Sequence, residues 1–426
     1  MGTPAILFDD AKGLLSPLND LRASFEIRTG ALTTAERLVA GLDIELVGMV
    51  VPAPLVELTS ESSPVPVNRP TELDDDAEVL LINGRCPLPL DVVANLTLGE
   101  VAVEKSSNDM VAVRLTAVDV RSLLTGGNPD MQTVEIDDEV LLSRPWSWRA
   151  FRDRCLAWDL DHFTEHMPKA PTADAVHELG QFPICVHPSA TVAPTVVLNA
   201  EDGPIVIDEN AVIRPGAIIT GPVYIGPGST VLEHALIKAQ TAIGPVCKVA
   251  GEIGGTIFQG FANKGHAGHL GDSWIGEWSN LGADTTNSNL LNTYAEVNAR
   301  PAPGAKMEKT GQTFLGVTMG DHTKTAIGTR IMTGAITGTG VMHAASTPIS
   351  GTSKAFDWVT DTGTKTYRLG KFVEVAMTVM QRRGVTQTQP YARRLTVLHE
   401  TVTGEAAFDW PGKDTSHLQA PTSERR

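Results

Sequence analysis

The chain has 426 residues, enough for two or three domains, and a hydrophobic content of 42%, which is ample for a sizeable core. Its net charge of −16 argues against general nucleic-acid binding, because the phosphates would be repelled. The sequence contains no apolar run of about 18 residues, so no membrane span is expected. Four scattered cysteines without a Cys-x-x-Cys pair argue against zinc or a disulfide framework. With no signal-peptide pattern at the start, a cytoplasmic protein is expected.

Residues 1–145 have the pattern of an α/β domain. Pro4–Phe8, Ile44–Val51 and Ala77–Asn83 are apolar runs that predict strands. A hydroxyl residue followed three positions later by glutamate, in Thr33–Glu36, predicts a helix start. The proline-rich stretch Ser60–Pro70 is expected to be a loop.

Residues 146–183 are predicted to form a linker that begins with a helix over Trp146–Met167. The apolar residues that fall near one face of this helix are Phe151, Cys155, Leu156, Phe163 and Met167. Prolines 168, 171 and 183 close the linker.

A six-residue period dominates the next region. Aliphatic residues stand at every sixth position, with small or polar residues between them, at Ile207, Ile213, Ile219, Ile225, Val231, Ile237, Ile243 and Val249. Neither a helix nor a strand has this spacing, whereas each coil of a parallel β-helix combines three such units. We therefore predict a β-helix over residues 184–350, with its regularity lost between Val249 and Ile275 and resumed over Ile275–Leu281.

The end of the chain is less regular. Residues 291–322 break the repeat and predict an excursion, and Lys324–Gly340 is expected to form closing coils. Within a C-terminal segment over 351–410, Tyr367–Arg383 predicts a helix that Gly384 stops. The polar tail 411–426 is expected to be disordered.

The lapse in the repeat is rich in polar residues and is the first place to look for chemistry. It contains His266 and His269 in a glycine-rich stretch, and a histidine can act as a general base at neutral pH. A structural role is the alternative for both, and for His269 it is preferred. A His-x-x-His metal pair lacks a convincing third ligand.

This region resembles the active-site coil of the left-handed β-helix acyltransferases, above all the acetyltransferase half of the bifunctional enzyme that makes UDP-N-acetylglucosamine. The matching segments are His266-Ala-Gly-His269-Leu-Gly-Asp272-Ser-Trp-Ile-Gly276, Asn280-Leu-Gly-Ala283-Asp284-Thr285, Asn289 and Lys324-Thr-Ala-Ile-Gly328. The resemblance implies a homotrimer with acyl sites between neighbouring coils, and acetyl-CoA as co-substrate. His269 stands where the family has tyrosine and Asp284 where it has glycine, so the identity of the acceptor stays open.

The same resemblance implies roles for individual residues. His266 would be the catalytic base and Asn289 would help to hold the amine, while His269 and Asn280 would contact the substrate. Lys264 and Lys324 are candidates for the sugar phosphate, and the amides near Gly282 and Ala283 for the oxyanion. A structural asparagine ladder is the alternative for Asn280, Asn287 and Asn289.

The first domain resembles a divergent sugar-nucleotidyltransferase family in which a shortened nucleotidyltransferase-like domain precedes this β-helix. The resemblance rests on Ile6-Leu-Phe-Asp-Asp10, Leu15-Ser-Pro-Leu18, Arg22, Ile27-Arg28-Thr29-Gly30 and Leu80-Leu-Ile-Asn83-Gly84-Arg85. The expected nucleotide or phosphate ligands are Asp9, Asp10, Lys12, Arg22, Arg28, Asn83 and Arg85. Asp10 is a weak candidate for Mg²⁺, since Asn83 replaces the usual metal-binding aspartate. A degenerate site with scattered charges is the alternative.

Three functions follow from these patterns. The first is acetyl-CoA-dependent transfer to the amine of a hexosamine 1-phosphate, within nucleotide-sugar synthesis. The second is nucleotidyl transfer from UTP or dTTP to a sugar 1-phosphate, with the β-helix serving mainly for trimerisation. The third is a non-catalytic β-helix assembly protein.

Overall fold

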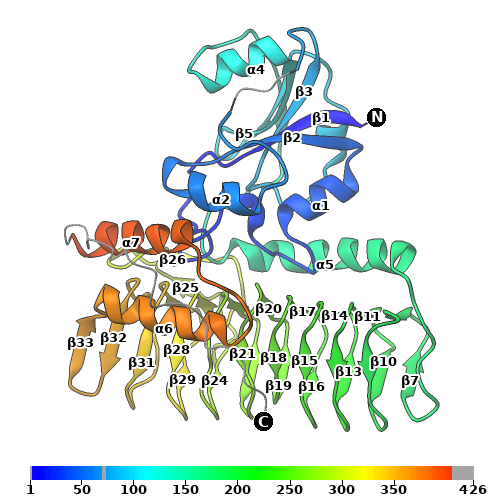
Figure 1. Ribbon diagram of the computed structural model, residues 1–426, viewed down its shortest axis with the longest axis vertical. Helices are drawn as coiled ribbons and strands as arrows, with labels where there is room; N and C mark the ends of the chain where they lie inside the picture. The colour runs from blue at the N-terminus through cyan, green and yellow to red at the C-terminus, as the bar shows by residue number, and fades with distance from the viewer. Residues whose placement is uncertain (1, 70–72, 405–426) are drawn as a thin grey trace, which may run out of the picture.

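The computed structural model describes residues 2–69 and 73–404. An α/β domain sits above a long row of short strands, and one long helix, α5, runs between the two (Figure 1). Within these described ranges, no helix has the length and apolar character needed to cross a membrane. The predicted arrangement of an α/β domain, a helical linker and a parallel β-helix is confirmed.

The N-terminal domain is built on a six-stranded sheet with the order β2-β1-β3-β5-β4-β6. Its strands are β1 (Thr3–Phe8), β2 (Ile44–Val50), β3 (Glu78–Asn83), β4 (Glu100–Glu104), β5 (Asp109–Thr116) and β6 (Gln132–Ile136). Its helices are α1 (Thr34–Gly41), α2 (Val56–Ser62), α3 (Asp91–Ala94) and α4 (Ala117–Leu124), with 3₁₀ turns η1 (Ser24–Glu26) and η2 (Ala53–Leu55). Because β1 runs parallel to both β2 and β3, the residues that follow β1 and β3 meet at one edge of the sheet.

Two local predictions in this domain have different outcomes. Thr33 caps α1 as expected, since its hydroxyl accepts from the Glu36 amide at 3.2 Å and its own amide donates to the Glu36 carboxylate at 2.7 Å. The loop predicted from Ser60 was wrong at its start, because α2 continues to Ser62. The prolines that suggested a loop lie beyond the end of this helix.

The linker helix α5 (Ser147–His166) lies along one face of the β-helix. As predicted, Phe151, Cys155 and Leu156 are buried, and Phe163 and Met167 pack against the same apolar cluster. That cluster includes the outward-facing residues of successive β-helix strands: Cys185, Val206, Tyr224, Ala242, Ile257 and Trp274. The β-helix therefore buries apolar residues both along its axis and beneath the linker.

The β-helix has three faces. The linker face, under α5, consists of β8 (Ile184–Val186), β11 (Ile205–Ile207), β14 (Val223–Ile225), β17 (Thr241–Ile243), β20 (Ile257–Phe258), β23 (Trp274–Ile275), β27 (Thr318–Met319) and β30 (Ile336–Thr337). The His269 face consists of β7 (His177–Gly180), β10 (Val197–Ala200), β13 (Ile218–Thr220), β16 (Leu236–Ile237), β19 (Glu252–Gly254) and β22 (His269–Gly271).

The third face, the Lys324 face, begins with β9 (Thr191–Val192), β12 (Val212–Ile213), β15 (Thr230–Val231), β18 (Lys248–Val249) and β21 (Asn263–Lys264). It continues with β28 (Lys324–Thr325), β31 (Met342–Ala344), β32 (Asp357–Thr360) and β33 (Gly363–Thr366). Single bridges from Asn263 to Asn280 and from Asn280 to Lys324 join the two groups of strands. β24 (Thr286–Asn287) pairs with β29 (Arg330–Ile331) beyond the His269 face strands.

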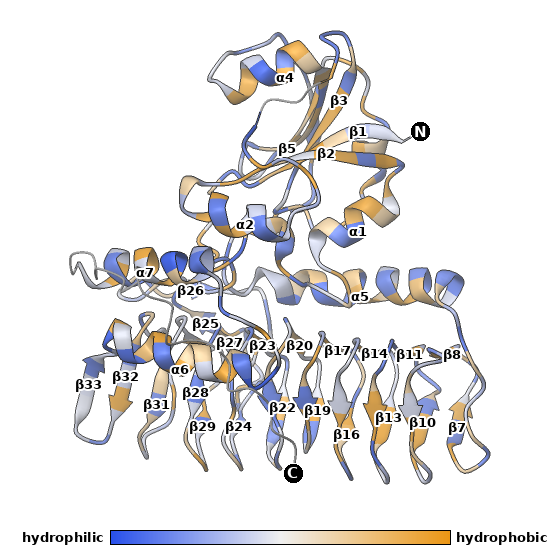
Figure 2. Cartoon of the chain, in the orientation of Figure 1, coloured by the Kyte–Doolittle hydropathy of each residue, from blue (hydrophilic) through white to orange (hydrophobic). Residues whose placement is uncertain are grey.

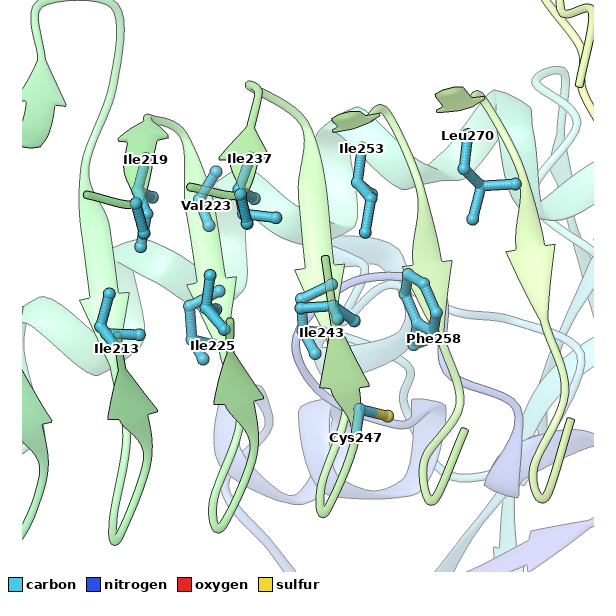
Figure 3. Close-up of a cluster of buried hydrophobic side chains, with 14 of the residues drawn as sticks. Ile213, Ile219, Val223, Ile225, Ile237, Ile243, Cys247, Ile253, Phe258 and Leu270 are labelled. Atoms are coloured by element: carbon cyan, nitrogen blue, oxygen red, sulfur yellow. The ribbon is translucent and has the colours of Figure 1, made fainter. Parts of the chain in front are cut away.

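The periodic aliphatic residues fill the axis, as predicted. All eight positions from Ile207 to Val249 have no exposed surface, and Figure 3 shows several of them stacked inside successive coils. Figure 2 shows the hydrophobic colouring on β10, β13 and β16 in this part of the helix. Stacking like residues in successive coils removes their apolar surface from water, which stabilises the fold.

The predicted start of the repeat was wrong, whereas the predicted loss of its six-residue period is confirmed. The first coil begins with β7 (His177–Gly180), ahead of the predicted start at Ile184. Between Val249 and Ile275 the period is lost but the coils continue, through β19, β20, β21 and β22. Some corners there are shorter, so the inward positions Ile253 and Phe258 follow at intervals other than six while the strands stay in register.

The excursion and the closing coils are confirmed, although the coil resumes at β27, ahead of the predicted end of the excursion at residue 322. The excursion carries the antiparallel pair β25 (Asn298–Ala299) and β26 (Glu308–Lys309). The predicted helix is α6 (Leu369–Gln381), and its buried face includes Phe372, Val373, Ala376 and Met380. A further helix, α7 (Gln389–Thr403), was not predicted, and the expected disordered tail from 411 lies outside the described residues.

Candidate active site on the β-helix surface

His266 lies at the corner of the coil between the Lys324 face and the His269 face. His266 is exposed in the turn that joins β21 to β22, and Gly268 adopts a φ of 118° in the same turn. Gly268 also approaches Thr285 of the next coil closely, so a side chain at this position would clash with the Thr285 backbone. The structure therefore presents the His266 imidazole to solvent at a tightly built corner.

Lys264 has a different environment from the one predicted. It pairs in register with Val249, so its side chain points into the axis, where it is only 1% exposed. Its Nζ donates to the carbonyls of Ala250 at 3.1 Å and His266 at 2.9 Å. Burial lowers the pKa of Lys264 to about 8, with a smaller opposing effect from Asp284. The structure thus places this lysine beneath the His266 turn, away from the surface where a phosphate would bind.

His269 faces a carboxylate. β22 pairs with β19 so that His269 lies opposite Glu252, with 3.4 Å between Nδ1 and Oε1. Although burial raises the pKa of Glu252, its hydrogen bond from Lys238 at 3.2 Å and the nearby His269 lower it overall. An ionised carboxylate beside Nδ1 orients an imidazole and leaves Nε2, on the opposite side of the ring, available to a ligand.

The Nε2 side of His269 adjoins Asn289 across Gly271. A Cβ built on Gly271 would lie 2.7 Å from His269 Nε2 and 2.6 Å from Asn289 Nδ2, so only glycine leaves this space open. Asn289 Nδ2 donates to Asp272 Oδ2 at 2.7 Å. Asp272 Oδ1 lies 2.8 Å from Arg152 and 3.1 Å from Arg149, both on the linker helix. His269 and Asn289 are therefore brought together, and the linker fixes one of them.

Three other asparagines have structural contacts. Asn287 is buried, and its side chain accepts from the Gly271 amide at 2.8 Å and donates to the Gly271 carbonyl at 2.9 Å. Asn263 donates to Asn280 Oδ1 at 2.7 Å across neighbouring coils. Of the three asparagines considered for a ladder, Asn280 therefore bonds to Asn263 of the neighbouring coil, Asn287 to the Gly271 backbone and Asn289 to Asp272.

A cavity of about 590 Å³ lies between the Lys324 face and the C-terminal end of α6. Asn280 and Lys324, both predicted to contact the substrate, line it together. Lys324 Nζ donates to the His322 carbonyl at 3.2 Å, and burial lowers the pKa of Lys324 to about 8. Further lining residues that the sequence did not single out are Lys248, Phe261, Trp278, Arg382 and Arg383.

The two predicted oxyanion donors lie at the corner of the next coil. The Gly282 amide donates to Thr325 Oγ1 at 3.0 Å, so it is already bonded within the coil. The Ala283 carbonyl accepts from the Gly328 amide at 2.7 Å. Both residues therefore help to stack this corner on the following one.

The strand ends of the N-terminal domain carry an internal network of charges. Asp10 accepts from Arg85 through both carboxylate oxygens, at 2.9 and 2.7 Å, and from Asn83 at 2.9 Å. Arg85 also reaches Asp109 at 2.6 Å, and Lys12 binds the other oxygen of Asp109 at 2.6 Å. Burial raises the pKa of Asp10, but the contacts with Arg85 and Asn83 outweigh it and lower the pKa overall.

This network does not fit a magnesium site. Both oxygens of Asp10 already accept hydrogen bonds, and Asp9 binds the amides of Ala11 at 2.9 Å and Ser24 at 2.7 Å. Mg²⁺ requires open oxygen ligands, whereas a guanidinium occupies the space between Asp10 and Asp109. Over residues 2–69 and 73–404, no group of three acidic, histidine or cysteine side chains is arranged to hold a metal.

Two of the predicted phosphate ligands contact the β-helix instead. Arg22 is buried and binds Asp321 at 2.9 Å and Glu277 at 3.2 Å. The Arg28 amide donates to Gln259 Oε1 at 2.9 Å, and the Arg28 carbonyl accepts from Trp274 Nε1 at 3.0 Å. These arginines join the two domains, so the structure does not gather Lys12, Arg22, Arg28 and Arg85 around one phosphate site.

Comparison with known proteins supports the N-terminal assignment. Residues 5–167 match the model of a family described as sugar nucleotidyl transferase. The predicted resemblance is thereby confirmed over the α/β domain and the linker helix, and a transferase classification follows. No curated protein matches the chain.

Solved structures that the chain resembles include sugar acyltransferases. The UDP-N-acetylglucosamine acyltransferase of Francisella novicida is 15% identical over 50% of this chain and 74% of its own, with a TM-score of 0.20. The acetyltransferase domain of PglB from Neisseria gonorrhoeae is 13% identical over 85% of this chain and 98% of its own, with a TM-score of 0.18. A histidine mutant of Caulobacter crescentus GDP-perosamine N-acetyltransferase, solved with CoA and GDP-perosamine, is 11% identical over 86% of this chain and 97% of its own, with a TM-score of 0.14.

Proposed function

We propose that the protein transfers an acetyl group from acetyl-CoA to the amine of a phosphorylated hexosamine. One observation carries this proposal: the strand that leads into the exposed His266 turn also lines a cavity with cationic residues. His266 lies three residues beyond Asn263, which lines the cavity together with Lys324 and Asn280. A general base beside a site for a phosphate suits an amino sugar phosphate, which presents an amine and an anion on one molecule.

In the proposed reaction, His266 removes a proton from the sugar ammonium or the attacking amine. The amine nitrogen then bonds to the thioester carbonyl carbon and forms a tetrahedral intermediate. On its collapse the C–S bond breaks, an amide is formed, and the CoA thiolate leaves and takes up a proton. Lys324 and Asn280 bind the acceptor, while His269 and Asn289, which flank the gap at Gly271, hold the amine.

The proposal includes a homotrimer with sites between neighbouring coils. The His269 face carries exposed apolar side chains, among them Leu179 and Ile218. Burying such residues against a second copy would remove apolar surface from water. A partner placed there would also cover the space beside His269 and exclude water from it.

The structure favours the degenerate alternative for the first domain over nucleotidyl transfer. The Arg85–Asp10 pair fills the place where Mg²⁺ and a triphosphate would have to bind. We therefore propose that this domain supports the β-helix, to which it is joined through Arg22 and Arg28.

A turnover screen on one preparation tests the proposal. Acetyl-CoA is mixed with glucosamine 1-phosphate and related amino sugar phosphates, and free CoA thiol is measured. Acceptor-dependent release of CoA that is lost in His266→Asn is expected. Absence of release with every amino sugar phosphate and every nucleotide-linked amino sugar, or full activity of the His266→Asn variant, would refute it. A parallel assay of pyrophosphate release from UTP with N-acetylglucosamine 1-phosphate and Mg²⁺ is expected to be negative.

A further inference from the structure

The cavity between the Lys324 face and α6 has an unusual charge. Lys248, Lys324, Arg382 and Arg383 all line it, and no carboxylate residue is among its lining. The chain as a whole carries 50 acidic and 34 basic residues, so four cations without a neighbouring carboxylate are not expected from its composition. Such a concentration of positive charge repels itself unless an anion is bound.

These four cations also lack acidic partners among the described residues. Nowhere in the described ranges does any of them form an ion pair with a carboxylate, whereas Arg22, Arg37, Arg85 and Arg152 all do. The side chains of Lys324 and Arg383 bind only carbonyls, those of His322 at 3.2 Å and Val246 at 3.1 Å. The second of these bonds fixes the end of α6 against the coil. The cationic groups are therefore held in place while their charges remain available to a ligand.

Aromatic rings form another part of the wall. Phe261 and Trp278 are stacked with their centroids 4.4 Å apart and an angle of 19° between their planes, and both line the cavity. Trp278 also stacks on His322, with centroids 6.3 Å apart, so its orientation is fixed. Trp278 stacks on both Phe261 and His322 and is only 4% exposed, so Phe261, which is partly exposed, is the ring that can stack on a nucleobase beside the cations.

We propose that this cavity binds a nucleoside diphosphate group. Four cations are more than one sugar phosphate requires, and the volume of about 590 Å³ accommodates a base, a ribose and two phosphates. The amides of Asn263 and Asn280 supply hydrogen bonds to the base or ribose. This inference deepens the proposed function and rests on it for the identity of the acceptor, which becomes a nucleotide-linked amino sugar.

A nucleoside diphosphate can reach this site from two sources. One is the nucleotide part of the acceptor, and the other is the nucleotide part of CoA. Calorimetric titration of the full chain with UDP, GDP, dTDP, ADP, CoA, UMP and inorganic phosphate separates them. Preference for a pyrimidine or guanine diphosphate that CoA does not displace assigns the site to the acceptor. Preference for ADP and CoA assigns it to the co-substrate.

The variants Lys248→Gln and Arg382→Gln remove two cations whose side chains make no hydrogen bond within the described structure. Each is expected to weaken diphosphate binding at least tenfold. Arg214→Gln, an exposed change on a distant coil, is the matched control and is expected to leave binding unchanged. Binding of inorganic phosphate or glucosamine 1-phosphate as tightly as the best diphosphate would overturn the inference, as would unchanged affinity in both cavity variants.

The outcome is distinguishable from that of the proposed function. Saturable diphosphate binding without acetyl transfer to any amino sugar would refute the acyltransferase proposal and leave the site assignment standing. Acetyl transfer to glucosamine 1-phosphate without diphosphate binding would support the acyltransferase proposal and refute the nucleoside diphosphate site.

Discussion

Glu252 Oε1 and His269 Nδ1 lie 3.4 Å apart on paired strands, and the opposite side of the imidazole adjoins the gap at Gly271. This arrangement matches a carboxylate that orients a histidine toward a substrate. The sequence pattern alone favoured a structural role for His269, because Glu252 stands 17 positions earlier.

Replacing Glu252 with glutamine is expected to lower kcat/KM for the amino sugar about tenfold, mainly through a higher KM, because His269 loses its orientation. Steady-state kinetics against the acceptor concentration measures this split. Lys238→Gln is the control, since Lys238 binds the same carboxylate oxygen. Equal effects of the two variants would mean that the carboxylate serves only the strand pairing.

The second prediction concerns His266. His266→Asn is expected to reduce kcat by about 10²- to 10⁴-fold, the usual contribution of a general base. Its side chain is exposed, so the melting temperature should not change. His234→Asn, at the equivalent corner of an earlier coil, is the matched control and is expected to keep full activity.

The third prediction concerns the attachment of the linker helix to the first domain. Arg37 and Asp159 have no exposed surface and are joined by two hydrogen bonds, at 2.6 and 2.7 Å. Asp159→Asn should lower the free energy of unfolding by about 3–5 kcal/mol, because it leaves a buried guanidinium without its counter-ion. Chemical denaturation measures this loss. Asp137→Asn breaks the exposed pair with Lys105 and should cause no measurable change.

Stability should also depend on pH through Lys264. Its pKa is about 8 in the folded protein and 10.5 when it is free, so the unfolded chain binds more protons between these values. The stability of the protein should therefore rise with pH from about 8 to about 10.5, by at most about 3 kcal/mol. Denaturation of the wild type and Lys264→Met across this range isolates the effect. Parallel pH profiles for the two proteins would contradict it.

The last prediction concerns metal binding at the first domain. The wild-type protein should show no saturable Mn²⁺ binding there, because Arg85 occupies the space between Asp10 and Asp109. Arg85→Ala frees both carboxylates and is expected to gain weak, saturable binding that electron paramagnetic resonance detects. Adding Asp10→Ala should abolish it. Tight Mn²⁺ binding by the wild type would show that the ion displaces the arginine.

Much of the fold could be predicted because its signals are local. The six-residue period placed Ile207 to Val249 on the axis, since each coil repeats the same burial, and the Thr33–Glu36 cap fixed the start of α1. Where corners shorten, the period disappears although the strands continue. Lys264 then takes an inward position that its charge would not suggest.

The sequence by itself determined the architecture and identified the stretch from His266 to Asn289 as the candidate site. Only the tertiary structure decided which groups share a space. It turned Arg22 and Arg28 toward the β-helix, joined Asp10 to Arg85, and brought Arg382 and Arg383 over Lys324. The reason is that an ion pair or a cavity brings together residues that lie far apart in the chain. Which residues meet depends on how the helices and coils pack, and no local period in the sequence encodes that packing.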